Sequence, residues 1–188
     1  LVAFKNQIEA SGIFEKLSIK EKEFVLMTIH RPATVDSKVG LTKLIELIIK
    51  VTKKYKVVFP IHPRTLAKMQ EFDLKDKITG NENLIISEPL DYFSFQKLIK
   101  GSKFILTDSG GIQEESTYLQ VPCLTLRPNT ERPSTIEIGT NELTPFDISA
   151  IESKIKDIES GIYKKGSIPP FWDGNATERI VKALIEII

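Results

Sequence analysis

The sequence is short of the features that mark several large classes of protein. Cysteine occurs once, at Cys123, and histidine only twice among 188 residues. A single cysteine excludes a disulfide framework and fits a reducing compartment. No apolar run approaches the roughly 20 residues of a membrane-spanning helix, and no secretory signal is visible. We therefore expect a cytoplasmic protein without membrane contact, and a buried Cys123 within an apolar run.

An excess of charge of one sign is also missing. The chain has 26 Lys and Arg residues against 25 Asp and Glu residues, for a formal net charge of +1. The lysines are interleaved with acidic residues, whereas non-specific nucleic-acid binding needs a continuous basic surface. We expect no nucleic-acid partner, no metal site and no cofactor.

Length and composition are those of a globular domain, with 41% hydrophobic and 27% charged residues. The length of 188 residues suits one α/β domain with a sizeable core and is short for two. The first residues, Leu1-Val2-Ala3-Phe4, lack a methionine and already follow an apolar pattern. We interpret the chain as a fragment of a larger protein.

Short apolar runs alternate with helical patterns along the chain. The runs that predict strands are residues 24–29, 56–60, 84–86, 103–107 and 123–126. Periodicity and capping residues predict helices over residues 41–51, 64–74, 91–101, 111–119, 131–138, 147–161 and 177–188, and residues 166–174 predict a surface loop. Continuous apolar strands are typical of a parallel sheet covered on both faces. The pattern therefore predicts an α/β fold with a doubly wound, Rossmann-like parallel sheet.

The turn Asp108-Ser109-Gly110-Gly111 is the first candidate binding site. It joins an apolar strand to a helix, and ligands of open α/β sheets bind at the carboxyl ends of the strands. A helix start offers free N–H groups and partial positive charge, and two glycines let an anion approach the backbone. The Ser109 hydroxyl adds a donor, so the turn suits a phosphate or pyrophosphate. The alternative is a plain turn in which Asp108 or Ser109 only caps the helix. The place of the turn, late in the sheet, favours the phosphate.

Glu115 lies one helical turn beyond Gly111 and points along the same face. A carboxylate there would repel a phosphate but would suit the two hydroxyl groups of a ribose. Glu114 is rotated by about 100° on the helix, so we expect it to be solvated or paired with a neighbouring element. The alternative for both residues is a polar helix face.

His30 and Arg31 follow the first predicted strand, and His62 follows the second. A histidine beside an arginine at a strand end can bind anions or transfer a proton, although the two residues taken alone slightly favour a plain surface pair. Pro32 keeps Arg31 out of helical geometry. Both histidines fall at the same edge of the sheet, which favours a polar cleft there.

Two arginines and one aromatic residue complete the candidates. Arg127 and Arg132 follow the fifth strand and could clamp a phosphate, or could pair with Glu131 or Glu137. Phe95 could stack on a base or pack in the core, and both possibilities stay open.

Together, these segments resemble the C-terminal half of the non-hydrolysing UDP-N-acetylglucosamine 2-epimerases. The matching segments are residues 107–115, Val121-Pro122, Thr130-Glu131-Arg132-Pro133 and residues 137–140, with His30-Arg31, His62-Pro63, Asp173-Gly174 and residues 178–180 in the same order. The resemblance covers the chain from residue 1 to 188. It implies one half of a two-domain, glycosyltransferase-B-like fold, with helices at residues 1–17 and 175–188 near the domain junction.

The resemblance also implies a role for each candidate. Ser109, Gly110 and Gly111 would hold the UDP phosphates together with Arg132 and with His30 as the catalytic residue. Glu115 would bind the ribose, and Phe95 would lie near the uracil. Family members eliminate UDP to leave a glycal and add it back after inversion at C2, with the acidic residues for the C2 proton in the N-terminal half.

The implied function is the conversion of UDP-GlcNAc to UDP-ManNAc for surface polysaccharide. The implied partners are a UDP-sugar substrate, the protein's own N-terminal domain and, at full length, a second copy in a homodimer. This fragment alone would bind UDP without turnover. The alternatives are a glycosyltransferase and a non-catalytic UDP-sugar-binding module.

The sequence departs from the family after His30. Many members read His-Arg-Arg-Glu-Asn where this chain has His30-Arg31-Pro32-Ala33-Thr34. In several members, residues at the positions of Arg31 and His62 would help to bind a second, activating UDP-sugar. The departure bears on that activation, and it leaves a different N-acetylated sugar open.

Overall fold

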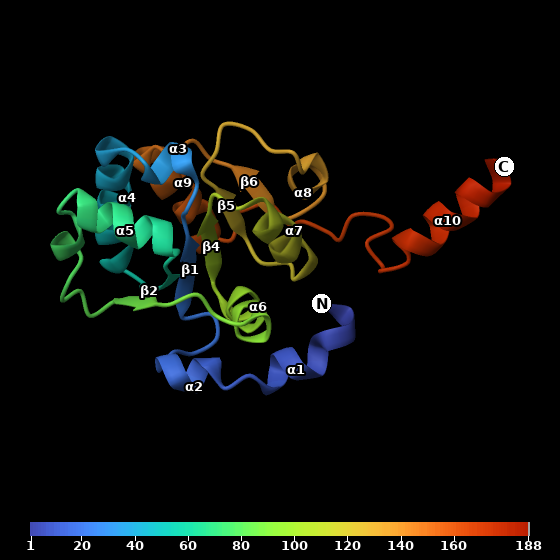
Figure 1. Cartoon of the computed structure of the whole chain (residues 1–188), viewed down its shortest axis with the longest axis horizontal. Coiled ribbons are helices and arrows are strands. Elements are labelled where there is room, and N and C mark those ends of the chain that lie inside the picture. Colours follow the sequence, from blue (N-terminus) through green and yellow to red (C-terminus); the bar gives the residue numbers. More distant parts are fainter. Residues whose placement is uncertain (188) are drawn as a thin grey trace.

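The computed structural model describes residues 1–187, in which one parallel sheet lies between helices (Figure 1). The strands are β1 (Phe24–Thr28), β2 (Lys56–Pro60), β3 (Leu84–Ser87), β4 (Phe104–Thr107), β5 (Cys123–Thr125) and β6 (Asn141–Leu143). Their order is β3-β2-β1-β4-β5-β6, and every neighbouring pair is parallel. This is the Rossmann order, whose direction reverses between β1 and β4. The predicted fold class is confirmed.

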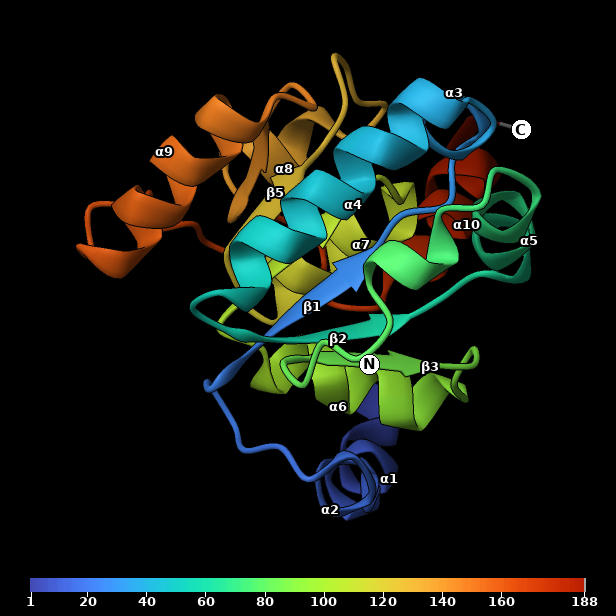
Figure 2. The ribbon, with the colours of Figure 1, turned by 90° about the vertical axis from the view of Figure 1, so that its left-hand side faces the viewer.

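Two layers of helices cover the two faces of the sheet (Figure 2). One layer contains α4 (Lys38–Thr52), α5 (Pro63–Glu71) and α9 (Ile148–Glu159), and the other contains α2 (Ile13–Leu17), α6 (Tyr92–Gly101) and α7 (Gly110–Tyr118). Along β1, Val25 and Met27 pack under the first layer, while Phe24 and Leu26 pack under the second. Both faces are therefore buried, which explains why the strand is a continuous apolar run.

Side-chain caps mark the starts of α4, α6 and α9. Ser37, Asp91 and Asp147 each accept a hydrogen bond from a backbone N–H in the first turn of their helix. Arg31 has extended backbone dihedrals before Pro32, as predicted. Cys123 is fully buried and has a free thiol.

Several element predictions were incomplete. The sequence did not predict β6, because Asn141 and Glu142 are polar and the strand is only three residues long. The helix predicted over residues 131–138 is shorter, and α8 spans Pro133–Glu137 after an irregular segment. The other short elements are η1 (Val2–Phe4), α1 (Lys5–Ala10), α3 (Pro32–Val35) and η2 (Lys75–Lys77).

The last helix, α10 (Ala176–Ile187), projects away from the rest of the chain (Figure 1). None of its residues is buried. Its exposed apolar side chains are Ile180, Val181, Leu184, Ile185 and Ile187. Within residues 1–187, no helix has both the length and the apolar character that crossing a membrane would require.

Candidate functional site

The candidate site lies where the carboxyl ends of β1 and β4 meet. Thr28 and Thr107 are partners across the two strands, and their buried hydroxyl oxygens are 2.7 Å apart. β1 ends two residues before His30, and β4 ends directly before Asp108. The segments that follow the two strands therefore begin side by side at one edge of the sheet. This place is the reversal in strand order, where open α/β sheets bind ligands.

Asp108 joins these two segments. Its side chain is 1% exposed, and its carboxylate accepts hydrogen bonds from the backbone N–H of His30 at 3.1 Å and of Arg31 at 2.9 Å. The Nδ1 atom of His30 lies 3.5 Å from the same carboxylate. The Asp108 carbonyl in turn accepts a hydrogen bond from Arg31 Nε at 2.9 Å. One buried carboxylate therefore fixes both the backbone and the side chain that follow β1.

The start of α7 carries no side-chain cap. Ser109 is the N-cap residue, but its hydroxyl makes no capping hydrogen bond, and Asp108 is committed to β1. The alternative, in which either residue only caps the helix, is therefore wrong. The first N–H groups of a helix have no partner within the helix, so α7 presents donors and positive dipole at the switch point.

The two glycines of the turn have different surroundings. A Cβ at Gly110 would lie 2.6 Å from a Glu131 carboxylate oxygen, so the protein itself occupies that space. A Cβ at Gly111 would meet nothing within 4 Å. Of the two glycines, only Gly111 leaves open space, whereas the sequence predicted open backbone at both.

The two histidines lie together, as the sequence predicted. Their ring centroids are 5.5 Å apart, with an angle of 28° between the ring planes. His62 Nδ1 accepts a hydrogen bond from the Arg64 backbone N–H at 3.1 Å, which leaves Nε2 as the protonated nitrogen of the neutral ring.

Arg31, Arg127 and Arg132 each lie beside a glutamate. Glu131 lies 3.0 Å from Arg127 Nη2 and 3.6 Å from Arg31 Nη2. Its hydrogen bond with Arg127 and the nearby charge of Arg31 lower the pKa of Glu131. Arg132 Nε lies 3.4 Å from Glu114, so Glu114 is tied to a neighbouring segment. Arg127 thus follows the pairing alternative, and Arg132 is exposed but has a carboxylate partner.

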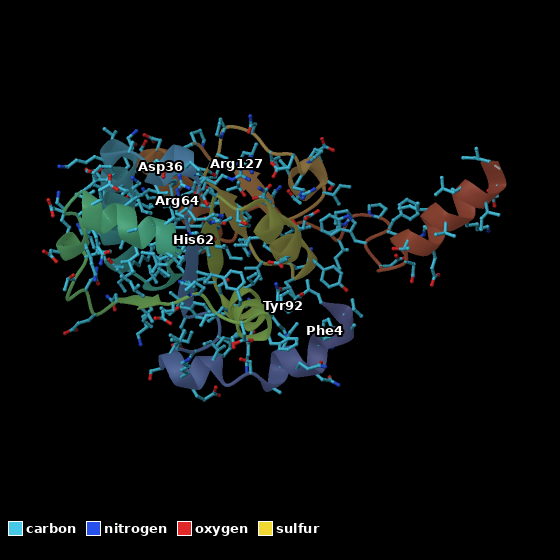
Figure 3. The ribbon with its side chains drawn as sticks, viewed as in Figure 1. Phe4, Asp36, His62, Arg64, Tyr92 and Arg127 are labelled. Carbon is cyan, nitrogen blue, oxygen red and sulfur yellow. The ribbon has the colours of Figure 1, made fainter. Side chains whose placement is uncertain are left out.

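A cavity of about 370 Å³ opens beside the start of α7. Its polar lining includes His30, His62, Ser109, Gln96 and Glu115, and its apolar lining includes Leu90, Tyr92, Phe95 and Ile112. His62 and Tyr92 reach it from the starts of α5 and α6 (Figure 3). Phe95 both lines the cavity and packs against the core, so both of its predicted roles are compatible with the structure.

Glu115 lies in this cavity one turn into α7, as predicted. Burial raises the pKa of its carboxyl, while Gln96 acts in the opposite direction. Arg31, in contrast, lines a separate cavity of about 560 Å³ with Lys43 and Arg127. Arg31 and His62, the pair predicted for an activator, therefore line different cavities.

A buried hydrogen-bond network behind the site escaped the sequence reasoning. Gln113 Oε1 accepts hydrogen bonds from Thr130 Oγ1 at 2.6 Å and from Asn141 Nδ2 at 3.1 Å. Thr130 Oγ1 also accepts from the Arg132 backbone N–H at 3.0 Å. The network ties the segment that carries Glu131 and Arg132 to α7 and β6. Only the Thr-Glu-Arg-Pro motif marks this segment in the sequence, and nothing there pairs Gln113 with Asn141.

Known proteins match this chain over the residues that form the candidate site. Residues 1–185 match the family model described as UDP-N-acetylglucosamine 2-epimerase. The chain belongs to the UDP-N-acetylglucosamine 2-epimerase family. This membership confirms the resemblance seen in the motifs around Ser109 and Arg132.

Curated members of the epimerase family match almost all of this chain. The UDP-N-acetylglucosamine 2-epimerase of Methanocaldococcus jannaschii is 41% identical over 186 residues, which cover 97% of this chain and 50% of that protein. The protein of the same name from Bacillus subtilis is 34% identical, with 89% of this chain and 44% of that protein covered. The chain thus spans about half the length of the curated relatives it matches.

Solved structures of epimerases match over the same half. The M. jannaschii UDP-GlcNAc 2-epimerase in complex with UDP-GlcNAc and UDP has a TM-score of 0.83 at 37% identity, covering 98% of this chain and 51% of that chain. The Neisseria meningitidis enzyme bound to UDP-GlcNAc has a TM-score of 0.77 at 28% identity, covering 99% and 50%. An Escherichia coli heptosyltransferase, at 15% identity and a TM-score of 0.56, shares the fold alone.

Removing the charge of Asp108 tests how much the site depends on it. We expect Asp108→Asn to lower the free energy of unfolding by about 2–3 kcal/mol, because the buried charge is lost and one of the two oxygens that accept from the His30 N–H becomes an N–H₂ group. Urea titration followed by circular dichroism measures the change. The control is Asp36→Asn, which breaks an exposed pair with Arg64 and should have a much smaller effect. Equal losses in the two variants would contradict the role assigned to Asp108.

Proposed function

We propose that this chain is the C-terminal, UDP-binding half of a UDP-N-acetylglucosamine 2-epimerase that interconverts UDP-GlcNAc and UDP-ManNAc. The observation that carries the proposal is the uncapped start of α7, which opens on a cavity that also holds Glu115. Structures of relatives with UDP or UDP-GlcNAc bound support a nucleotide-sugar ligand here.

The diphosphate of UDP would lie at the start of α7. Gly111 leaves room for an anion, and the first N–H groups of the helix and the Ser109 hydroxyl supply donors. His30 lines the same cavity and is held by Asp108, so its ring can face the phosphates. Arg132 is exposed and paired with Glu114 at 3.4 Å, and it would exchange that carboxylate for phosphate oxygens.

The nucleoside would fill the rest of the cavity. Glu115 lies beyond the helix start, far enough along the helix to accept hydrogen bonds from the ribose hydroxyls. Phe95 and Tyr92 offer aromatic faces near the uracil, and Leu90 adds an apolar wall. A diphosphate at the start of α7 and a ribose at Glu115 can belong to one nucleotide bound in one orientation.

The reaction would break the bond between C1 of the sugar and the β-phosphate oxygen. A base in the other half of the protein takes the C2 proton, the electron pair forms the C1–C2 double bond, and UDP leaves with the C1–O electrons. Re-addition of UDP with protonation on the opposite face of C2 gives the epimer. This half contributes by stabilising the departing UDP anion, and His30 acts as the catalytic residue that touches it.

The missing half would pack near α10 and the start of the chain, at residues 175–188 and 1–17. The apolar side chains of α10 have no cover within residues 1–187, and Leu1 lies in one cavity with Glu114, Glu115 and Tyr118. We place the full-length protein in the cytoplasm as a homodimer; the lone Cys123 fits a reducing compartment.

Substitution of Gly111 tests the phosphate position. We expect Gly111→Ala to leave the stability unchanged or to raise it by up to about 1 kcal/mol, because the added methyl group meets no neighbour. The affinity for UDP should fall by at least about tenfold, because the methyl group occupies the place of the anion. Isothermal titration calorimetry compares Gly111→Ala with the wild type and with the control Gly12→Ala, whose Cβ meets only Glu15 at 3.9 Å. Unchanged affinity in Gly111→Ala would place the diphosphate elsewhere.

The raised pKa of Glu115 predicts how UDP affinity depends on pH. The ionised carboxylate accepts both ribose hydroxyls, so affinity falls as the pH drops through the pKa of Glu115. Because burial raises this pKa, the loss begins at a higher pH than for an exposed glutamate. UDP titrations between pH 5 and pH 8 on the wild type and on Glu115→Gln separate this loss from protonation of the phosphate itself. Parallel pH profiles in the two proteins would exclude Glu115 from ribose binding.

The reaction class is testable with the protein that contains both halves. UDP-GlcNAc in deuterated water should yield UDP-ManNAc with deuterium at C2, without an added acceptor, and NMR detects the exchange. The 188-residue chain alone should bind UDP without forming product. A requirement for an acceptor sugar would indicate a glycosyltransferase, and binding without any product from the complete protein would indicate a regulatory module.

A further inference from the structure

Gln96 is a buried amide without hydrogen-bond partners. It lies on α6, the residue is 0% exposed, and neither its Nε2 nor its Oε1 atom has a partner within residues 1–187. A buried amide that donates and accepts nothing destabilises a protein, so such groups are rare without a function. Gln96 also lines the cavity beside α7, next to Phe95.

A charged group on the facing helix, Glu115, lies beside Gln96. Helices α6 and α7 pack against each other, and both residues line the same cavity. Gln96 is close enough to Glu115 to lower the pKa of that carboxyl against the larger effect of burial. The two side chains are therefore neighbours, although no hydrogen bond between them is formed within residues 1–187.

We propose that Gln96 is a positioning residue that holds the Glu115 carboxylate toward the two ribose hydroxyls of the nucleotide. This inference rests on the proposed UDP site. The Gln96 N–H₂ group donates to one carboxylate oxygen of Glu115, and the remaining lone pairs accept the hydroxyl groups of the sugar. The bound nucleotide thereby completes a hydrogen-bond chain that the free protein leaves open.

Another buried glutamine shows why Gln96 is unusual. Gln113 on α7 is also 0% exposed, but its Oε1 accepts two hydrogen bonds and its Nε2 donates to the Ser109 carbonyl at 3.3 Å. Gln113 thus has the partners that a structural amide needs. Gln96 has no such partners within residues 1–187. It lies in the wall of the cavity, whereas Gln113 lies behind it.

The test replaces Gln96 with methionine, which has nearly the same shape and no amide. Calorimetric titrations use two probes, UDP and 2′,3′-dideoxy-UDP, which lacks both ribose hydroxyls. We expect Gln96→Met to weaken UDP binding about tenfold, the loss of one hydrogen bond to a charged group, and to change 2′,3′-dideoxy-UDP binding less than about twofold. Thermal unfolding of the free variant should occur at an unchanged or higher temperature, because an unpaired buried amide has been removed.

Gln113→Met is the matched control. It removes an amide whose oxygen and nitrogen both have hydrogen-bond partners, so it should lower the unfolding temperature and change the affinities for the two probes by the same factor. The proposal is overturned if Gln96→Met lowers the unfolding temperature and weakens binding of both probes by the same factor. It is also overturned if Gln96→Met no longer folds or leaves the UDP affinity unchanged. If the wild type binds neither probe, the proposed UDP site itself fails, which is a different result from any of these.

Discussion

The hydrogen bonds that the buried Asp108 carboxylate accepts from His30 and Arg31 hold the candidate site together. They connect the ends of β1 and β4, Thr28 and Thr107, which are 79 residues apart in sequence and adjacent in the sheet. Because β4 continues directly into α7, the same contacts fix where the helix begins relative to β1. The uncapped start of the helix, the histidine and the cavity wall are therefore all held in place by Asp108.

The charged side chains around Asp108 are paired within the protein itself. Glu131 lies between Arg31 and Arg127, and Glu114 lies against Arg132. These carboxylates keep the arginines from repelling one another and order the segment after β5. A diphosphate would compete for Arg132, whose pair is exposed and weakly held, more easily than for Arg127, whose side chain is 12% exposed. The site thus has one arginine that can change partners, Arg132, and one that keeps its partner, Arg127.

The sequence predicted the features that local pattern determines. Apolar runs predicted five of the strands, and the change from strand to helix at Ser109 predicted where α7 begins, beside a cavity. It did not predict β6, because Asn141 is made part of the sheet by hydrogen bonds to Gln113, Thr125 and Thr135 rather than by its own preference. Asp108 looked like a helix cap, since its true partners are 77 and 78 positions away. Contacts between residues so far apart in the sequence cannot be recognised from the local spacing of residue types.

The exposed helix α10 has a thermodynamic consequence for the protein. Twelve residues are too few for stable helicity in water without packing, because nucleation costs more than so short a segment recovers. Its helical content is then linked to whatever covers its isoleucine and leucine side chains. The free energy of forming this helix is therefore subtracted from the affinity of α10 for the surface that covers it.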